Sequence, residues 1–142
     1  RAIEASPNSP LSHQLLAIYY NRQGEFDKTM AAFQRRAELE PNNPEAWHTM
    51  GTYYYDKVYR DASVPREQAI QYLEAAVAAE DKALAINPDY YEAVTYKGML
   101  LALRANRERD LAAQKRFLNE AEQLRTRSME LEKKQGSVTS AN

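Results

Sequence analysis

The sequence predicts an all-α fold: an α-α superhelix, or solenoid, of about three stacked antiparallel helical hairpins. Short sequence segments of similar composition end in proline at Pro7, again 34 residues later at Pro41, and a third time at Pro88. A fixed period of this length is typical of solenoids, in which each hairpin buries its apolar face only against its neighbours. Between the prolines, apolar residues recur three and four residues apart, which is the spacing of a helix face.

The first hairpin is expected over residues 9–43. Ser9 followed by Pro10 is a typical helix start, because the serine side chain can accept a bond from a free backbone N–H and proline has no N–H to satisfy. Gly24 interrupts the apolar spacing and marks the turn between the two helices. Pro41 then ends the second helix, because proline cannot continue an α-helix.

The second hairpin is expected over residues 44–90 and is longer than the period. The distance from Pro41 to Pro88 is 47 residues, an excess of 13. Six of these residues are expected to enlarge the loop at 58–65, and seven to lengthen the helix at 66–86. Seven residues make almost two helical turns, so the buried row of that helix should keep its direction. That row begins with Ala69, Leu73 and Ala76.

The third hairpin is expected over residues 91–136. Asp89 and Glu92 have the spacing of a capping box, in which two side chains satisfy N–H groups at a helix start. The second helix, expected over 110–134, should turn Leu118 and Ala121 towards the core. Lysines near its end and Gly136 after them favour a helix C-terminus at that point.

Together these phrases resemble the tetratricopeptide repeat, whose pattern is W-x2-L-G-x2-Y, then A-x3-F and a closing proline. The middle hairpin carries the pattern at Trp47, Met50, Gly51, Tyr54, Ala69, Leu73, Ala76 and Pro88. The first carries it at His13, Leu16, Ala17, Tyr20, Thr29, Phe33 and Pro41. The third keeps Val94, Gly98 and Leu101 but has Lys97 and Gln114 at places that are usually apolar or small, so its geometry should be the least regular.

The resemblance implies one tetratricopeptide repeat domain over residues 1–136. The small residues Ala17, Gly51 and Gly98 should let the second helix of each hairpin approach the first closely. The domain would comprise the end of a truncated preceding repeat (1–8), a first repeat (9–43), a second repeat with the 13-residue insertion (44–90), and a degenerate third repeat with a capping helix (91–136), followed by a frayed tail (137–142).

Composition excludes several classes of function. With 19 basic and 20 acidic residues the net charge is -1, whereas nucleic-acid binders usually carry a basic excess. The chain has no cysteine, which excludes disulfides and thiolate metal sites. No apolar run approaches the roughly 20 residues that cross a bilayer, so direct membrane insertion is not expected. Charge is uneven along the chain, with 4 basic and 8 acidic residues in 44–90 but 10 and 7 in 91–142, which suits either a solvated surface or an end-to-end contact with another array.

The resemblance further implies that the chain binds a protein or peptide segment in a concave groove. In this family the groove is lined by first-helix residues that lie off the core row. One branch of the family grips a C-terminal carboxylate with lysine, asparagine and arginine, but the corresponding places hold no Lys or Arg here, and that clamp is not expected. The candidate binding residues are Gln14, Ile18, Asn21, Arg22, His48, Thr52, Tyr55, Asp56, Thr95 and Met99.

Catalysis is not expected, and neither is a cofactor or a metal. The two histidines lie in different hairpins without a zinc-binding pattern, and there is no Gly-rich phosphate loop. The acidic pair Glu80-Asp81 is expected on a polar helix face. Two alternatives to peptide binding stay open: a self-assembly scaffold that uses the long helices 66–86 and 110–134 and forms a homo-oligomer, and an accessory domain of a larger enzyme.

Overall fold

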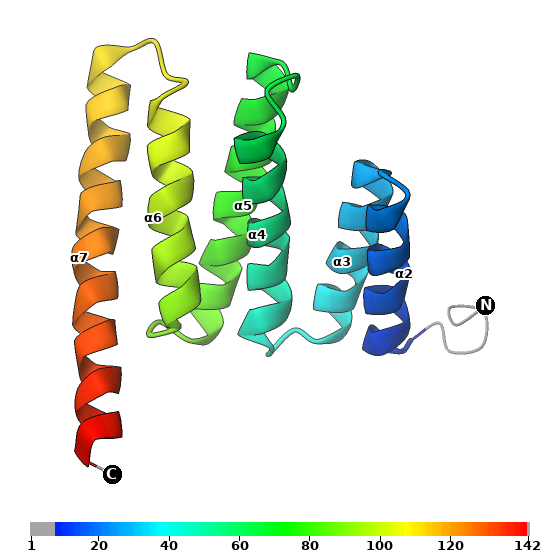
Figure 1. Ribbon diagram of the computed structural model, residues 1–142, viewed down its shortest axis with the longest axis horizontal. Helices are drawn as coiled ribbons and strands as arrows, with labels where there is room; N and C mark the ends of the chain where they lie inside the picture. The colour runs from blue at the N-terminus through cyan, green and yellow to red at the C-terminus, as the bar shows by residue number, and fades with distance from the viewer. Residues whose placement is uncertain (1–7, 142) are drawn as a thin grey trace.

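The computed structural model describes residues 8–141, with side chains described to residue 136, and within these residues it contains helices and no strand. Successive helices run in opposite directions, and the helix pairs lie side by side in one row (Figure 1), so the predicted all-α solenoid is confirmed. The helices are α2 (Pro10–Arg22), α3 (Phe26–Leu39), α4 (Pro44–Arg60), α5 (Arg66–Ile86), α6 (Tyr91–Ala105) and α7 (Leu111–Ala141).

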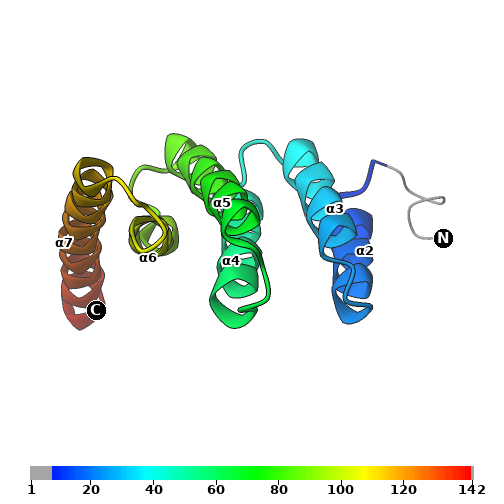
Figure 2. The ribbon, with the colours of Figure 1, turned by 90° about the horizontal axis from the view of Figure 1, so that it is seen from above.

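The helices pack as consecutive pairs, α2 with α3, α4 with α5 and α6 with α7, and the pairs are joined by contacts of α3 with α4 and of α5 with α6. Figure 2 shows α3 and α5 on one side of the row, while α7 lies at its end beside α6. The last pair is therefore the irregular one, as expected. Its two unusual residues form polar contacts: Lys97 Nζ lies 2.7 Å from Asp81 of α5, and Gln114 donates a 3.1 Å hydrogen bond to the Ala105 carbonyl.

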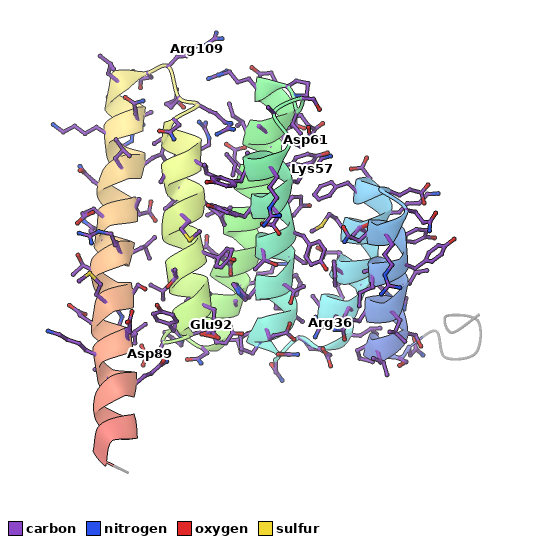
Figure 3. All side chains as sticks on the ribbon, viewed as in Figure 1. Arg36, Lys57, Asp61, Asp89, Glu92 and Arg109 are labelled. Carbon is purple, nitrogen blue, oxygen red and sulfur yellow. The ribbon has the colours of Figure 1, made fainter. Side chains whose placement is uncertain are left out.

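Side chains cap the starts of two helices, and the cap predicted at Ser9 is confirmed. Ser9 Oγ accepts a hydrogen bond from the Ser12 N–H at the start of α2, and Asn43 Oδ1 accepts one from the Glu45 N–H at the start of α4. The same Glu45 also receives the guanidinium of Arg36, which is buried at the junction of α3 and α4 at an N···O distance of 2.5 Å (Figure 3). This ion pair ties the start of the second helix pair to the end of the first.

The predicted capping box of α6 is wrong. The residue before the helix is Tyr90, and no side chain caps the N-terminus. The Asp89 carboxylate instead accepts a hydrogen bond from Arg127 of α7, so a contact across the fold replaces the local one with Glu92.

The insertion between the first and third pairs is mostly helical. α4 continues to Arg60, so the loop predicted at 58–65 is wrong for its first three residues. Val58 is only 4% exposed and packs in the same buried cluster as Leu73 and Leu100, and this burial accounts for the extra turn of helix. The lengthened helix α5 has the predicted bounds.

The buried row of α5 keeps its direction through the two added turns, as predicted. Its members are Ala69, Leu73, Ala76, Ala79, Glu80 and Ala83. The prediction that Glu80 lies on a polar helix face is wrong, because its side chain is fully buried. Glu80 follows Leu73 by one heptad, and the same helical spacing that buries the leucine buries the glutamate.

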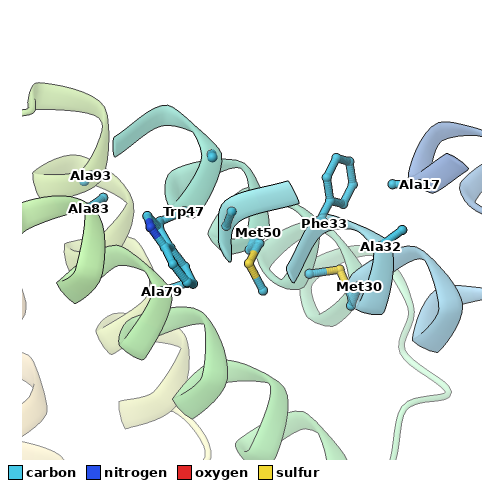
Figure 4. Close-up of a cluster of buried hydrophobic side chains, with 11 residues drawn as sticks. Ala17, Met30, Ala32, Phe33, Trp47, Met50, Ala79, Ala83 and Ala93 are labelled. Carbon is cyan, nitrogen blue, oxygen red and sulfur yellow. The ribbon is translucent and has the colours of Figure 1, made fainter. Parts of the chain in front are cut away.

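Aromatic and small residues build the core between the first two pairs. Trp47 of α4 lies beside Ala79 of α5, and Met30 and Phe33 of α3 belong to the same cluster (Figure 4). The rings of Phe33 and Tyr53 are 4.6 Å apart across the junction of the pairs. Alanines along α5 leave room for the indole, so the large side chains come from α3 and α4.

α7 departs from the sequence prediction at two places. The helix continues through Gly136, where no terminus forms, and Leu118 is 47% exposed instead of buried. The buried residues of α7 include Ser128 and Leu131. Because α7 packs on α6 alone, only a narrow stripe of its surface is covered.

The close packing of Glu80 against Gly51 gives a first test of the fold. A Cβ at this position would lie 2.1 Å from the Glu80 Oε2, so Gly51→Ala is expected to lower the free energy of unfolding by about 1–3 kcal/mol in urea titrations. Gly136→Ala is the matched control, because nothing lies within 4 Å of the added carbon. In a Glu80→Ala background the cost of Gly51→Ala should largely vanish, and an unchanged cost would show that the crowding has another source.

Candidate functional site

The ten candidate binding residues all lie on α2, α4 and α6, but the structure distributes them over separate places. Gln14 and Ile18 are half-buried on α2, and Arg22 is exposed at the end of that helix. The other candidates line a cleft between the first two pairs, one face of α4, the joint of α4 with α5 and α6, and a groove between α6 and α7. They do not form one continuous groove.

The cleft brings together two candidates from different helices, Asn21 of α2 and Asp56 of α4. It has a volume of about 430 Å³. Its other lining residues come from the start of α3 and the end of α4, where Figure 3 labels Lys57 and Asp61. The full lining is Asn21, Phe26, Tyr53, Asp56, Lys57, Arg60 and Asp61.

Fixed charges occupy the α4 side of this cleft. Asp61 accepts hydrogen bonds from the Ser63 hydroxyl and, at 2.9 Å, from Lys57 Nζ. These bonds, that of Ser63 first, lower the pKa of Asp61 to about 2. The carboxylate therefore stays ionised throughout the neutral range, and Lys57 is held beside it.

One face of α4 next to the cleft carries four residues at positions i, i+3, i+4 and i+7, namely Thr52, Tyr55, Asp56 and Tyr59. The rings of Tyr55 and Tyr59 are stacked, with centroids 5.4 Å apart and planes 13° apart. Tyr59 is 65% exposed. Tyr96 of α6 meets Tyr55 edge-on at 5.6 Å, so aromatic surface continues from α4 to α6.

His48 belongs to a buried pair with Glu80. Its Nδ1 lies 3.0 and 3.1 Å from the two carboxylate oxygens, and its side chain is only 12% exposed. Tyr96 and Tyr90 contact the imidazole edge-on at 5.0 and 5.7 Å. The ring therefore points into the joint of α4, α5 and α6, where it has a packing role and offers little surface to a partner.

Burial raises the pKa of Glu80 to about 7, and the hydrogen bond from His48 opposes that rise. The nearby charge of Asp81 raises it further. A buried carboxylate is costly unless a partner satisfies it, and here the imidazole is that partner. The sequence carried one signal for this pair: Glu80 follows the buried Leu73 by seven residues and so shares its helix face. In the structure that face places Glu80 against Gly51.

The last two candidates, Thr95 and Met99, line the groove between α6 and α7. The Thr95 and Ser128 hydroxyls are hydrogen-bonded at 2.6 Å across it. The groove has a volume of about 330 Å³ and a mostly apolar lining, with Gly98, Ala102, Leu118, Ala121, Glu122 and Arg125 as its other residues. At Gly98 a Cβ would lie 3.5 Å from the Ala121 carbonyl, so the predicted close approach of the second helix is present here.

The described residues hold no group of three or more His, Cys, Asp or Glu side chains that could bind a metal ion. Across the same part of the chain, no helix combines the length and apolar character that crossing a bilayer would require.

Comparison with known proteins supports the resemblance seen in the sequence. The tetratricopeptide repeat family model matches residues 10–53, which span α2, α3 and the beginning of α4. Over these residues the chain is therefore similar to the tetratricopeptide repeat, as its motifs predicted. This segment contains the cleft residue Asn21 and the α4 residue Thr52.

Solved structures of MamA proteins overlap most of the chain. A crystal structure of MamA is 16% identical, covers 95% of this chain and 85% of its own, and gives a TM-score of 0.35. The RS-1 ArsTM double mutant of MamA is 18% identical with coverage of 94% and 80% and a TM-score of 0.36. A further crystal structure of MamA protein is 16% identical with coverage of 95% and 79% and a TM-score of 0.34. At these TM-scores no residue or function is transferred from those proteins.

The raised pKa of Glu80 predicts a specific pH dependence. The folded chain holds this proton more tightly than the unfolded chain, whose carboxyl has the ordinary pKa of 4.5. The stabilising contribution is therefore full below pH 4.5 and is lost as the pH rises through about 7. Relative to Glu80→Gln, the free energy of unfolding of the wild type should fall by about 1–3 kcal/mol over this range.

The measurement is a series of urea titrations between pH 4 and pH 8. Glu67→Gln is the control, because the Glu67 side chain on the same helix is 83% exposed. A difference between wild type and Glu80→Gln that stays flat with pH, or that grows in favour of the wild type as the pH rises, would contradict the assignment.

Proposed function

We propose that this chain is a non-catalytic protein-interaction scaffold that binds a polypeptide segment on the face of α4 that carries Tyr55, Asp56 and Tyr59. Tetratricopeptide repeat sequence and stacked helix pairs support a protein-interaction scaffold in general. The finer assignment rests on the surface that runs from the cleft beside α2, across Asp56 and Tyr59, to Tyr96 of α6.

The observation that carries the proposal is the stacked pair of Tyr55 and Tyr59, of which Tyr59 is exposed and Tyr55 is half-buried. Aromatic side chains supply large contact area with little conformational entropy to lose, and tyrosine is enriched among the residues that dominate binding energy. Tyr59 is already held against Tyr55, so binding would not have to order its ring. An exposed ring that is already held in position by its neighbour is a favourable anchor for a partner side chain.

The cleft beside this pair supplies polar partners. Asn21 offers an amide donor and acceptor, and Asp56 offers a carboxylate that is 58% exposed. Asp56 meets Arg60 at only 3.8 Å, a weak exposed contact that a ligand can replace. An extended segment could therefore pair its backbone with these groups while a side chain enters the cleft.

Charge indicates which side chain fits. Residues 44–90 are acidic in balance, and Asp56 lies next to Tyr59 on the face of α4. A lysine or arginine of the partner would meet a carboxylate and an aromatic face together, which combines an ion pair with a cation–π contact. We therefore expect the bound segment to carry a basic residue.

The test begins with peptides selected for binding to the wild-type chain from a random displayed library. Their dissociation constants are then measured for Tyr59→Ala and Asp56→Ala. Each change should weaken binding about tenfold, equal to about 1.4 kcal/mol, because each removes one anchor from a small interface. Arg116→Ala on the exposed surface of α7 is the control and should bind like the wild type.

The selected peptides should also be enriched in Lys and Arg. If both α4 variants keep wild-type affinity while folding normally, the binding surface lies elsewhere and the proposed site is wrong. Peptides enriched in acidic residues would contradict the assigned partner chemistry even if the α4 variants weaken binding.

A further inference from the structure

The first helix of the row has an uncovered apolar stripe. Leu11, Leu15 and Tyr19 follow one another at intervals of four residues on α2, and their exposed fractions are 60%, 51% and 55%. Residues four apart lie on one side of a helix, so the three side chains form a continuous ridge.

The positions equivalent to Tyr19 in the other helix pairs are covered. By the repeat register that aligns His13, Trp47 and Val94, Tyr19 corresponds to Tyr53 in α4 and to Leu100 in α6. The Tyr53 ring packs on Phe33 of α3, and Leu100 is fully buried in a cluster with residues of α5. The Tyr19 end of the α2 ridge thus lies on the surface that, in the other two pairs, contacts the preceding helix pair.

The opposite end of the row has the complementary surface. Thr95 and Ala102 of α6 line the apolar groove beside α7, and their equivalents in α4 are His48 and Tyr55. Both α4 residues contact Tyr96 of the following pair. The α6/α7 groove is therefore the surface on which a following pair would stack.

The same register identifies what the groove would receive. Tyr96, the residue of α6 that contacts α4, corresponds to Leu15 at the centre of the α2 ridge. The described helices therefore carry both halves of this stacking contact, one on α2 and one on α6 and α7, and no other described helix covers either of them.

We propose that copies of this chain stack head to tail, with the α2 ridge of one copy lying in the α6/α7 groove of the next. At 1.5 Å per residue the ridge is about 12 Å long and the groove segment from Thr95 to Ala102 about 10 Å long. The charged residues at the groove, Glu122 and Arg125, are paired with each other at 2.6 Å, so docking leaves no new charge unpaired.

The two surfaces differ, so the contact is heterologous and adds copies in an open series instead of closing a dimer. A ridge of three side chains is far smaller than the roughly 800 Å² per partner of a standard interface. Association should therefore be weak, and we expect it at high protein concentration as a gradual rise in average mass.

The experiment uses sedimentation equilibrium of the whole chain at tens to hundreds of micromolar. Leu15→Glu disables the ridge and Leu118→Glu disables the groove, and both residues are about half exposed, so the fold should tolerate the changes. The wild type should exceed its monomer mass of 16.3 kDa progressively, and each variant alone should remain monomeric. An equimolar mixture of the two should form one-to-one dimers and nothing larger, because only one intact ridge and one intact groove remain.

Leu111→Glu is the matched control, because Leu111 is exposed on α7 outside the groove, and it should associate like the wild type. If Leu118→Glu still self-associates while Leu15→Glu does not, the contact joins ridge to ridge and the proposal is overturned. A wild type that stays monomeric throughout also overturns it and leaves both surfaces to a different helical partner. If either variant loses helical circular dichroism, Leu→Ser at the same position takes its place. The stacking does not depend on Tyr59 or Asp56, so its failure is distinct from failure of the proposed peptide site.

Discussion

The joint between the second and third helix pairs depends on one missing side chain. Gly51 leaves room for the carboxylate of Glu80, and that carboxylate is satisfied by His48 from the same helix as the glycine. A buried carboxylate without a partner would cost several kcal/mol, so α4 and α5 have a favourable register only where all three positions coincide. Tyr90 and Tyr96 then close over the imidazole from the α6 side, and the third pair takes its place against the second.

This joint also determines which side chains of α4 stay accessible to a partner. The contact with Glu80 turns His48 into the fold. Tyr55 lies two turns along the same helix and stacks on Tyr59, and the Tyr59 ring is exposed. Both were equivalent candidates in the sequence because both lie off the core row of a first helix. Packing separates them: one becomes part of the fold, and the other supports the proposed binding surface.

The periodic signals in the sequence were sufficient for the architecture. Recurring prolines and helical spacing predicted the order of the helices. The seven residues that lengthen the helix at 66–86 predicted that α5 would keep its buried row. Predictions that depended on short local patterns failed where a distant residue competed. Asp89 had the spacing of a cap but pairs with Arg127, which lies 38 residues away. Val58 was expected in a loop but is buried by Leu73 and Leu100, so helix continues.

The site was predictable only to the level of helices for the same reason. Whether a first-helix residue faces solvent depends on side chains from the next pair, and a single chain without aligned relatives does not reveal those contacts. The exposed faces of α2 and of the α6/α7 groove are different, because the repeat register predicts which positions of a neighbouring pair would contact them. If copies stack as proposed, each adds one further α4 face along the array. A weak binding surface repeated in this way gains affinity for a partner with several matching segments, through effective concentration and without any new contact.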